Sequence, residues 1–231
     1  MVVALSVSTF VVVVLRRGIP EQEQADKGGA WAMARQLIGL VRESAELRAF
    51  LIANMLWELS LAALKTFVIL YVTKSIGMST SGASLVVGAV AVVVLVASPV
   101  SGKLGDRLGR AKVMTWSLVV YGIGLIAPFL TTNPVILIPV LPIVAFGGGV
   151  IMTLPYALLM PMMPDAEHGA LTGFYSVSRG AGVALGPALA GVAIQIAGND
   201  YGAMWLVCAA AILASIPFTR RLRDDDQAEA A

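Results

Sequence analysis

Charge and cysteine are scarce in this sequence, and each scarcity excludes something. Only 13% of the 231 residues are charged, against about 25% in soluble domains, and a net charge of +2 is too small to indicate a nucleic-acid partner. The single cysteine, Cys208, cannot form an intrachain disulfide and leaves the redox compartment open. Histidine and cysteine show no metal-ligand spacing, and no serine has a neighbouring histidine to activate it. We therefore expect no enzyme, no metal site and no bound cofactor.

Apolar residues take the place of the missing charges. They make up 58% of the chain, and the mean hydropathy is +0.85. One soluble core of this length could not hide so much apolar surface from water, so we predict an all-α protein whose main partner is the lipid bilayer. Five runs are long enough to span a membrane as helices, and a sixth comes close. They cover roughly residues 49–73, 81–101, 113–130, 134–163, 170–197 and 203–219.

The first 47 residues differ from the rest. Residues 1–15 are apolar but short for a span, and their positive charge follows the apolar run, whereas in a signal peptide it precedes it. We interpret them as the remnant of a transmembrane helix, with an interfacial or fraying helix as the alternative. Residues 16–47 are predicted to form a cytoplasmic central loop, with either an amphipathic surface helix or a solvated linker helix. Residues 48–219 then form a six-helix transmembrane domain, followed by a tail at 220–231.

Lysine and arginine are distributed unequally between the two sides of this topology. One side holds the bases of residues 16–48, 103–112 and 220–223, and the opposite side holds only Lys74. Cytoplasmic loops of membrane proteins carry an excess of such bases. The C-terminal tail is therefore predicted to be cytoplasmic, in a plasma (inner) membrane.

The most distinctive motif lies between the second and third predicted spans of the six-helix domain, at residues 102–112. Its glycines allow a sharp turn and a close approach of helices, and its aspartate can accept hydrogen bonds from a helix N-terminus. A solvated loop would explain the bases but not the aspartate or the glycine spacing. We therefore predict a tight cytoplasmic turn. Its key residues are Gly102, Asp106, Arg107, Gly109 and Arg110, with Lys112 as a later base.

These residues resemble the signature loop of the major facilitator superfamily, Gly-x-x-x-Asp-Arg-x-Gly-Arg followed by further bases; Ala111 departs from the pattern. The resemblance implies a conformational latch in the C-terminal half of a secondary active transporter, which moves a small-molecule substrate by alternating access. A proton or sodium gradient would drive it. A half encloses no pathway by itself, so the resemblance also implies an N-terminal half or a second copy as partner. The alternative is a transport-inactive membrane fragment or scaffold subunit.

Three charges lie inside predicted spans, where they are costly and usually functional. Glu58 and Arg179 each lie about 13 Å from the cytoplasmic end of their helices. We predict that they form a gating or coupling pair, or else a purely structural ion pair. Lys65 can contact an anionic substrate group or extend its amine to the interface. Trp57 and Tyr156 could stack on a sugar ring, or could anchor interfaces or pack.

Glycine and proline mark two further segments. Gly148, at the centre of a glycine triplet, and Pro155 predict a weakened, bent helix that exposes backbone groups to substrate, or else close helix packing. Gly182, Gly186 and Pro187 belong to a small-residue stripe that predicts helix contact or a hinge. The segment over residues 155–179 resembles the sugar:cation symporter branch of the superfamily, although drug and metabolite exporters can look similar.

Overall fold

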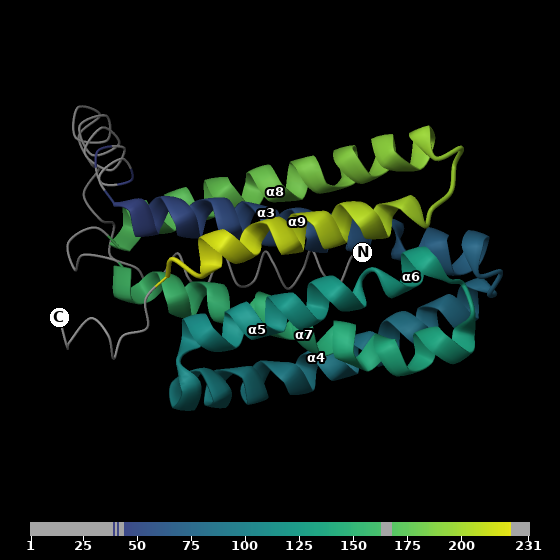
Figure 1. Ribbon diagram of the computed structural model, residues 1–231, viewed down its shortest axis with the longest axis horizontal. Coiled ribbons are helices and arrows are strands. Elements are labelled where there is room, and N and C mark those ends of the chain that lie inside the picture. Colours follow the sequence, from purple (N-terminus) through teal and green to yellow (C-terminus); the bar gives the residue numbers. More distant parts are fainter. Residues whose placement is uncertain (1–38, 40, 42–43, 163–167, 223–231) are drawn as a thin grey trace, which may run out of the picture. The chain divides into compact units, whose positions relative to one another are not determined.

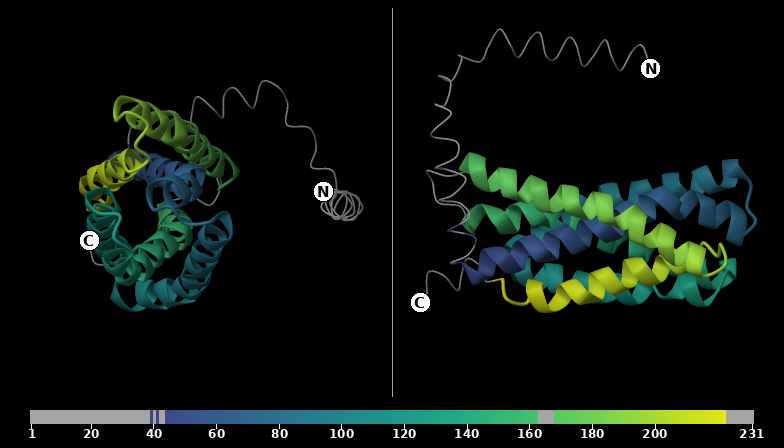
Figure 2. Two further views of the ribbon diagram at one scale, coloured as in Figure 1. Left: turned by 90° about the vertical axis from the view of Figure 1, so that its right-hand side faces the viewer. Right: turned by 90° about the horizontal axis from the view of Figure 1, so that it is seen from above.

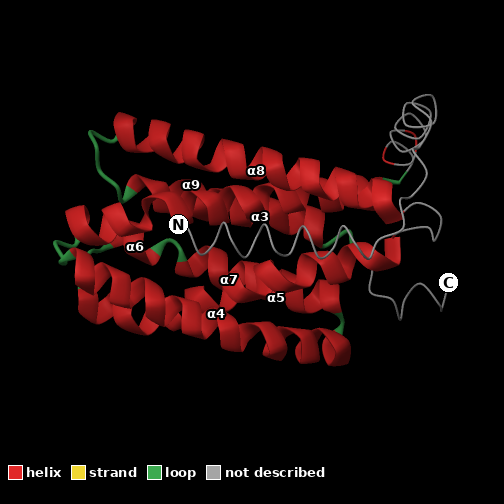
Figure 3. Ribbon diagram, turned by 180° about the vertical axis from the view of Figure 1, so that it is seen from behind, coloured by secondary structure: helices red, strands yellow, loops and turns green. Residues whose placement is uncertain are grey.

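The computed structural model describes residues 39, 41, 44–162 and 168–222. Apart from residue 39, they all belong to one compact unit that spans residues 41–231. Within the described residues the regular structure is entirely helical (Figure 3). The predictions for residues 1–15, for most of residues 16–47 and for residues 223–231 lie outside the described residues.

The six predicted spans of the transmembrane domain are present as helices. Five helical stretches are long and apolar enough to cross a membrane, and the last apolar helix, α9, is shorter. This outcome confirms the prediction that five runs meet the length requirement and a sixth approaches it. The helices are α3 (Ala45–Leu70, continued by a π-helical turn at Tyr71–Ser75), α4 (Thr80–Leu108), α5 (Arg110–Gly124), α6 (Ala127–Leu130), α7 (Pro134–Leu159, continued by a 3-10 turn at Met160–Met162), α8 (His168–Ile196) and α9 (Ala203–Thr219).

Side-chain caps fix where three of these helices begin. The hydroxyl of Ser44 accepts a hydrogen bond from the backbone N–H of Leu47 at 3.1 Å, at the start of α3. Ser79 caps α4 in the same way, and the side chain of Asn133 accepts from the N–H of Val135 at the start of α7. Short polar side chains at these positions satisfy backbone donors that have no partner within the helix.

Apart from the short α6, the described helices of this unit pack as two groups of three. Helices α3, α8 and α9 contact one another closely, as do α4, α5 and α7, and the main contact between the groups is that of α5 with α9. Figure 1 shows the first group above the second, and the end-on view in Figure 2 separates them again. Large apolar side chains cover the outer surface, as expected for lipid-facing helices. Examples are Leu85 and Leu95 on α4, Val135 on α7 and Ile196 on α8.

The predicted turn at residues 102–112 is much smaller in the structure. Helix α4 continues through Gly102 and Asp106 to Leu108, and α5 begins at Arg110. Gly109 alone breaks the helix, with φ of +91°, a backbone conformation that glycine adopts at low cost. The predicted turn is therefore present but shorter than expected, because the charged residues around Asp106 are compatible with a helix and one glycine is enough to end it.

Helix α7 is continuous through its glycine triplet and through Pro155. A Cβ added at Gly147 would lie 2.7 Å from the Cβ of Tyr121 on α5, and one at Gly149 would lie 2.6 Å from the Cβ of Ala97 on α4. Gly148 itself has only ordinary van der Waals neighbours. Neighbouring helices occupy the space that two of the glycines leave, so the triplet serves close helix packing, which was one of the two alternatives predicted from the sequence.

Candidate functional site

An ion pair joins the middle of α3 to α8. The Nε of Arg179 lies 3.0 Å from Oε1 of Glu58, so the structure brings together the two charges that sequence depth placed at one level. The exposures of the two side chains differ widely, at 54% for Arg179 and 13% for Glu58. The carboxylate is thus nearly enclosed between the helices, whereas the guanidinium extends outward from the contact.

Toward the starts of α3 and α8, two further contacts join the same two helices. Together with the ion pair they form a line of contacts that we call the seam. The amide of Asn54 donates to the hydroxyl of Ser178 at 2.6 Å, one helical turn from the ion pair. One turn further, the rings of Phe50 and Tyr175 stack with their centroids 6.3 Å apart. Sequence reasoning missed Asn54 and Ser178. The four-residue spacing of Phe50, Asn54 and Glu58, which places all three on one face of α3, was a signal that could have found them.

Further along α8, after the ion pair, two glycines allow α8 to lie directly against α3. A Cβ at Gly182 would collide with the carbonyl oxygen of Met55, and one at Gly186 would collide with the carbonyl oxygen of Leu59. The backbone of α8 therefore lies directly against that of α3 over this stretch, as small-residue stripes allow. Pro187 lies inside the same continuous helix.

The two aromatic candidates have different surroundings. Trp57 is 0% exposed, and its Nε1 donates to the hydroxyl of Ser215 on α9 at 2.9 Å. Its ring also packs edge-on against Phe50. Trp57 is thus a packing residue between α3 and α9, which was one of the two alternatives left open by the sequence, because neither its ring nor its N–H is accessible.

Tyr156 is the accessible aromatic residue of the site. Its side chain on α7 is 48% exposed, and its ring meets that of Tyr175 edge-on at a centroid distance of 6.1 Å. It therefore ends a run of aromatic contacts that begins at the buried Trp57 and passes through Phe50 and Tyr175. Lys65 is exposed two turns beyond Glu58 on α3, and the structure does not bring it to the ion pair.

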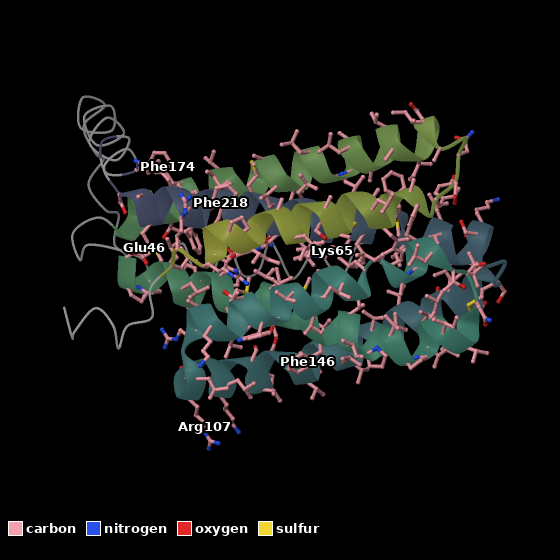
Figure 4. The ribbon with its side chains drawn as sticks, in the orientation of Figure 1. Glu46, Lys65, Arg107, Phe146, Phe174 and Phe218 are labelled. Carbon is pink, nitrogen blue, oxygen red and sulfur yellow. The ribbon has the colours of Figure 1, made fainter. Side chains whose placement is uncertain are left out.

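The junction of α4 and α5 is held by Arg110. Its Nη2 lies 3.3 Å from Oδ1 of Asp106 on α4, and its Nη1 donates to the carbonyl oxygen of Ala157 at 3.2 Å, in the last turn of α7. One guanidinium thus joins the end of α4, the start of α5 and the end of α7. Figure 4 shows Arg107, by contrast, pointing away from the helices at this end of the bundle.

The residues of the predicted latch do not all lie as their sequence pattern suggested. Asp106 accepts from the Arg110 side chain, not from a helix N-terminus as expected. A Cβ at Gly105 would lie 3.2 Å from Cγ of Arg110, so this glycine gives the arginine room to cross. A Cβ at Gly102 would meet nothing within 4 Å, so close approach does not explain this glycine.

Comparison with protein families identifies the group to which this arrangement belongs. The family model described as "Major Facilitator Superfamily" matches residues 50–231, most of the chain. The chain belongs to the major facilitator superfamily. It is an integral membrane protein of a transporter family and not of an enzyme family.

Individual relatives cover only part of the chain. The "Putative multidrug resistance protein MdtD" of Salmonella typhi, like that of Salmonella newport, is 30% identical over 126 residues, which are 54% of this chain and 26% of that protein. A bacterial homologue of the human drug peptide transporters PepT1 and PepT2 superposes with a TM-score of 0.66 at 17% identity, over 75% of this chain and 41% of that one. A bacterial homologue of the iron transporter ferroportin, outward-facing, gives 0.65 at 17% identity, over 78% and 45%.

Two facts follow from these relatives. The likeness to the solved transporters establishes the superfamily fold, with helices in the same arrangement. The chain spans about a quarter of the length of MdtD and less than half of either solved transporter.

The first prediction concerns the latch of this superfamily member. Arg110→Gln is expected to lower the midpoint of thermal unfolding in detergent micelles by a few degrees, because the end of α7 loses its hydrogen bond and Asp106 loses its partner. A hydrogen bond to a charged group contributes about 1.5–3 kcal/mol. Circular dichroism measures the midpoint. Arg107→Gln is the matched control and should leave it unchanged; equal midpoints for the two variants would contradict the assigned contacts.

Proposed function

We propose that this chain is the C-terminal half of a secondary active transporter, which moves a small solute across the membrane by alternating access. Membership of the superfamily supports transport in general. The observation that carries the finer proposal is the Glu58–Arg179 pair, a carboxylate and a guanidinium at 3.0 Å in the middle of two membrane-spanning helices. Ionisable residues at that depth are costly and mark substrate or ion pathways.

The coupling role follows from the way a charge pair responds to a third partner. Together the two side chains are neutral, which lowers the cost of placing them in the membrane. A proton or sodium ion that binds Glu58 competes with the pair and weakens the contact between α3 and α8. We infer that a proton or sodium gradient acts through Glu58, whose enclosed carboxylate depends on Arg179 for its neutralisation.

The proposal includes a partner and an orientation. One half of such a transporter lines only one side of a pathway, so we propose that an N-terminal half or a second copy of this chain supplies the other side. The bases at residues 103–112 and 220–223 favour a cytoplasmic C-terminus in a plasma (inner) membrane. In this orientation Arg110 would hold the latch at the cytoplasmic side.

Several observations bear on the substrate class of the proposed transporter. The sugar:cation branch has the sequence resemblance of residues 155–179 in its favour, but the relatives described above carry names of drug, peptide and iron transporters. Trp57, one of the two aromatic residues that a sugar ring could have used, is enclosed. We therefore do not retain sugar symport within the proposal.

The second prediction tests the coupling role of Glu58. Glu58→Gln is expected to reduce accumulation against a gradient at least tenfold, because the neutral amide can neither form an ion pair with Arg179 nor exchange a proton. Proteoliposomes that contain the full chain are given an imposed proton or sodium gradient, and uptake of 2-naphthoate, ethidium and glucose is measured. Glu46→Gln, on the same helix, is the matched control. If Glu58→Gln accumulates a probe as well as the unsubstituted chain does, the proposed coupling role of Glu58 is contradicted.

The second candidate function is a transport-inactive fragment or scaffold subunit. The chain matches less than half of each solved transporter described above, and one half of such a transporter lines only one side of a pathway. Absence of uptake for every probe, together with a monomeric state in nanodiscs, would support this alternative over transport.

A further inference from the structure

The Arg179 guanidinium has more hydrogen-bonding capacity than the ion pair uses. It carries five N–H donors, and among the described residues its ion-pair partner is Glu58, through Nε and Oε1. The two terminal amino groups are therefore left without a protein partner in the described part of the chain. The side chain is 54% exposed, so the terminal amino groups are accessible.

The geometry of that free end suits a carboxylate. The terminal amino groups of an arginine lie in one plane and donate two parallel hydrogen bonds to the two oxygens of a carboxylate. Because Glu58 is held through Nε, a second carboxylate can bind the terminal groups without displacing it. A cationic ligand has no equivalent place, since the Glu58 carboxylate is 13% exposed and already paired.

The charges of the surrounding helices favour an anion. Helix α7 and helix α8 contain no aspartate or glutamate. On α3 the other acid, Glu46, lies three turns before Glu58, and the exposed Lys65 lies two turns after it. Around the neutral ion pair, the nearest unpaired charge on these helices is thus positive.

Aromatic side chains lie next to this arginine. Tyr175 is one helical turn before Arg179 on α8, and its ring contacts that of Tyr156, which is 48% exposed. Phe50 also stacks on Tyr175. An aryl group can thus lie on the tyrosines while a carboxylate on the same molecule reaches Arg179, and ring contacts of this kind favour offset or edge-on geometry.

We propose that Arg179 binds the carboxylate of an amphipathic aryl anion, whose ring lies against Tyr156 and Tyr175. This inference rests on the proposed transport function, for which it names the substrate class. Glu58 then acts as the residue that orients the guanidinium, and Arg179 as the residue that contacts substrate.

The third prediction tests charge preference with three probes that share one ring system. Equilibrium dialysis in detergent micelles, with protein-free micelles subtracted and no gradient present, measures binding of 2-naphthoate, 2-naphthylmethylammonium and 2-naphthylmethanol by naphthalene fluorescence. The full chain is expected to bind 2-naphthoate at least about tenfold more tightly than the other two, the usual effect of a charge-assisted hydrogen-bond pair. Equal or tighter binding of the ammonium probe would overturn the proposal.

Variants then assign the effect to residues. Arg179→Gln should weaken the binding of 2-naphthoate at least tenfold. Arg179→Lys should weaken binding less, because an amine keeps the positive charge but cannot donate two parallel hydrogen bonds. Tyr156→Ala should weaken binding about threefold. Lys74→Gln, a base at the other end of α3, is the control and should bind normally. If Arg179→Gln does not fold, Arg179→Lys and the three-probe comparison on the unsubstituted chain still decide. Unchanged 2-naphthoate affinity in a folded Arg179→Gln would also overturn the proposal.

The binding test and the uptake test can contradict the binding site and the transport function separately. A chain that prefers the anion through Arg179 but accumulates no probe would contradict the proposed transport and leave the binding site standing. A chain that accumulates a probe but shows no anion preference would contradict the substrate class alone.

Discussion

Gly186→Ala is expected to destabilise the folded chain by about 1–3 kcal/mol, the usual cost of forcing a methyl group into packed surroundings. The added Cβ would overlap the carbonyl oxygen of Leu59 and lie 3.0 Å from the backbone nitrogen of Ala63. Both obstacles are backbone atoms of α3, so no rotamer change can relieve them, and the two helices must separate. Chemical unfolding in mixed micelles, followed by circular dichroism, measures the change in unfolding free energy.

The same helix offers a matched control. A Cβ at Gly180 would meet nothing within 4 Å, so Gly180→Ala adds the same methyl group to α8 without a collision. It should be neutral or should stabilise the helix by up to about 1 kcal/mol, because alanine has the higher helix propensity. Equal unfolding free energies for the two variants would show that α8 does not approach α3 as closely as described.

Trp57→Ala is expected to destabilise the chain more than Gly186→Ala does, by about 3–5 kcal/mol. The indole is 0% exposed, packs edge-on against Phe50 and donates to Ser215, so its removal leaves a large cavity between α3 and α9. Trp116→Ala is the control, because that tryptophan on α5 is 64% exposed. Both are measured by the same unfolding experiment.

A second substitution separates the ring from its hydrogen bond. Trp57→Phe keeps an aromatic ring and removes the N–H, and the Ser215 hydroxyl retains its own bond to the carbonyl oxygen of Ile212. The expected loss is therefore small, about 1 kcal/mol. If Trp57→Ala instead leaves stability unchanged and weakens 2-naphthoate binding, Trp57 contacts substrate and its assignment to the packed interior is incorrect.

The membrane-spanning helices were predictable because their signal is local. A run of about 20 apolar residues is sufficient to span the hydrocarbon layer, whatever its neighbours are. The meeting of Glu58 with Arg179 was predictable for a related reason, since two opposite charges in an apolar phase at one depth gain most by pairing. The roles of both residues in coupling and binding stay predictions.

Features that depend on neighbouring helices were not predictable. Whether the glycine triplet at residues 147–149 weakens a helix or packs it depends on Tyr121 and Ala97, which come from other helices. The burial of Trp57 depends in the same way on Ser215, far along the chain on α9. The short break at Gly109 was missed for a different reason, because charge and glycine content indicate a loop but do not measure its length.

The glycine contacts between α3 and α8 have a consequence for how this helical unit can change shape. Helices α3 and α8 touch through backbone atoms at Gly182 and Gly186, and they are tied by Asn54–Ser178 and Glu58–Arg179 along the same line. Sliding one helix along the other would break all of these contacts together. We therefore expect α3 and α8 to move as one rigid body. We expect bending or shear within this unit to occur at the α5–α9 contact, which is the main contact between the two helix groups and includes Leu213, Ile212 and Gly122.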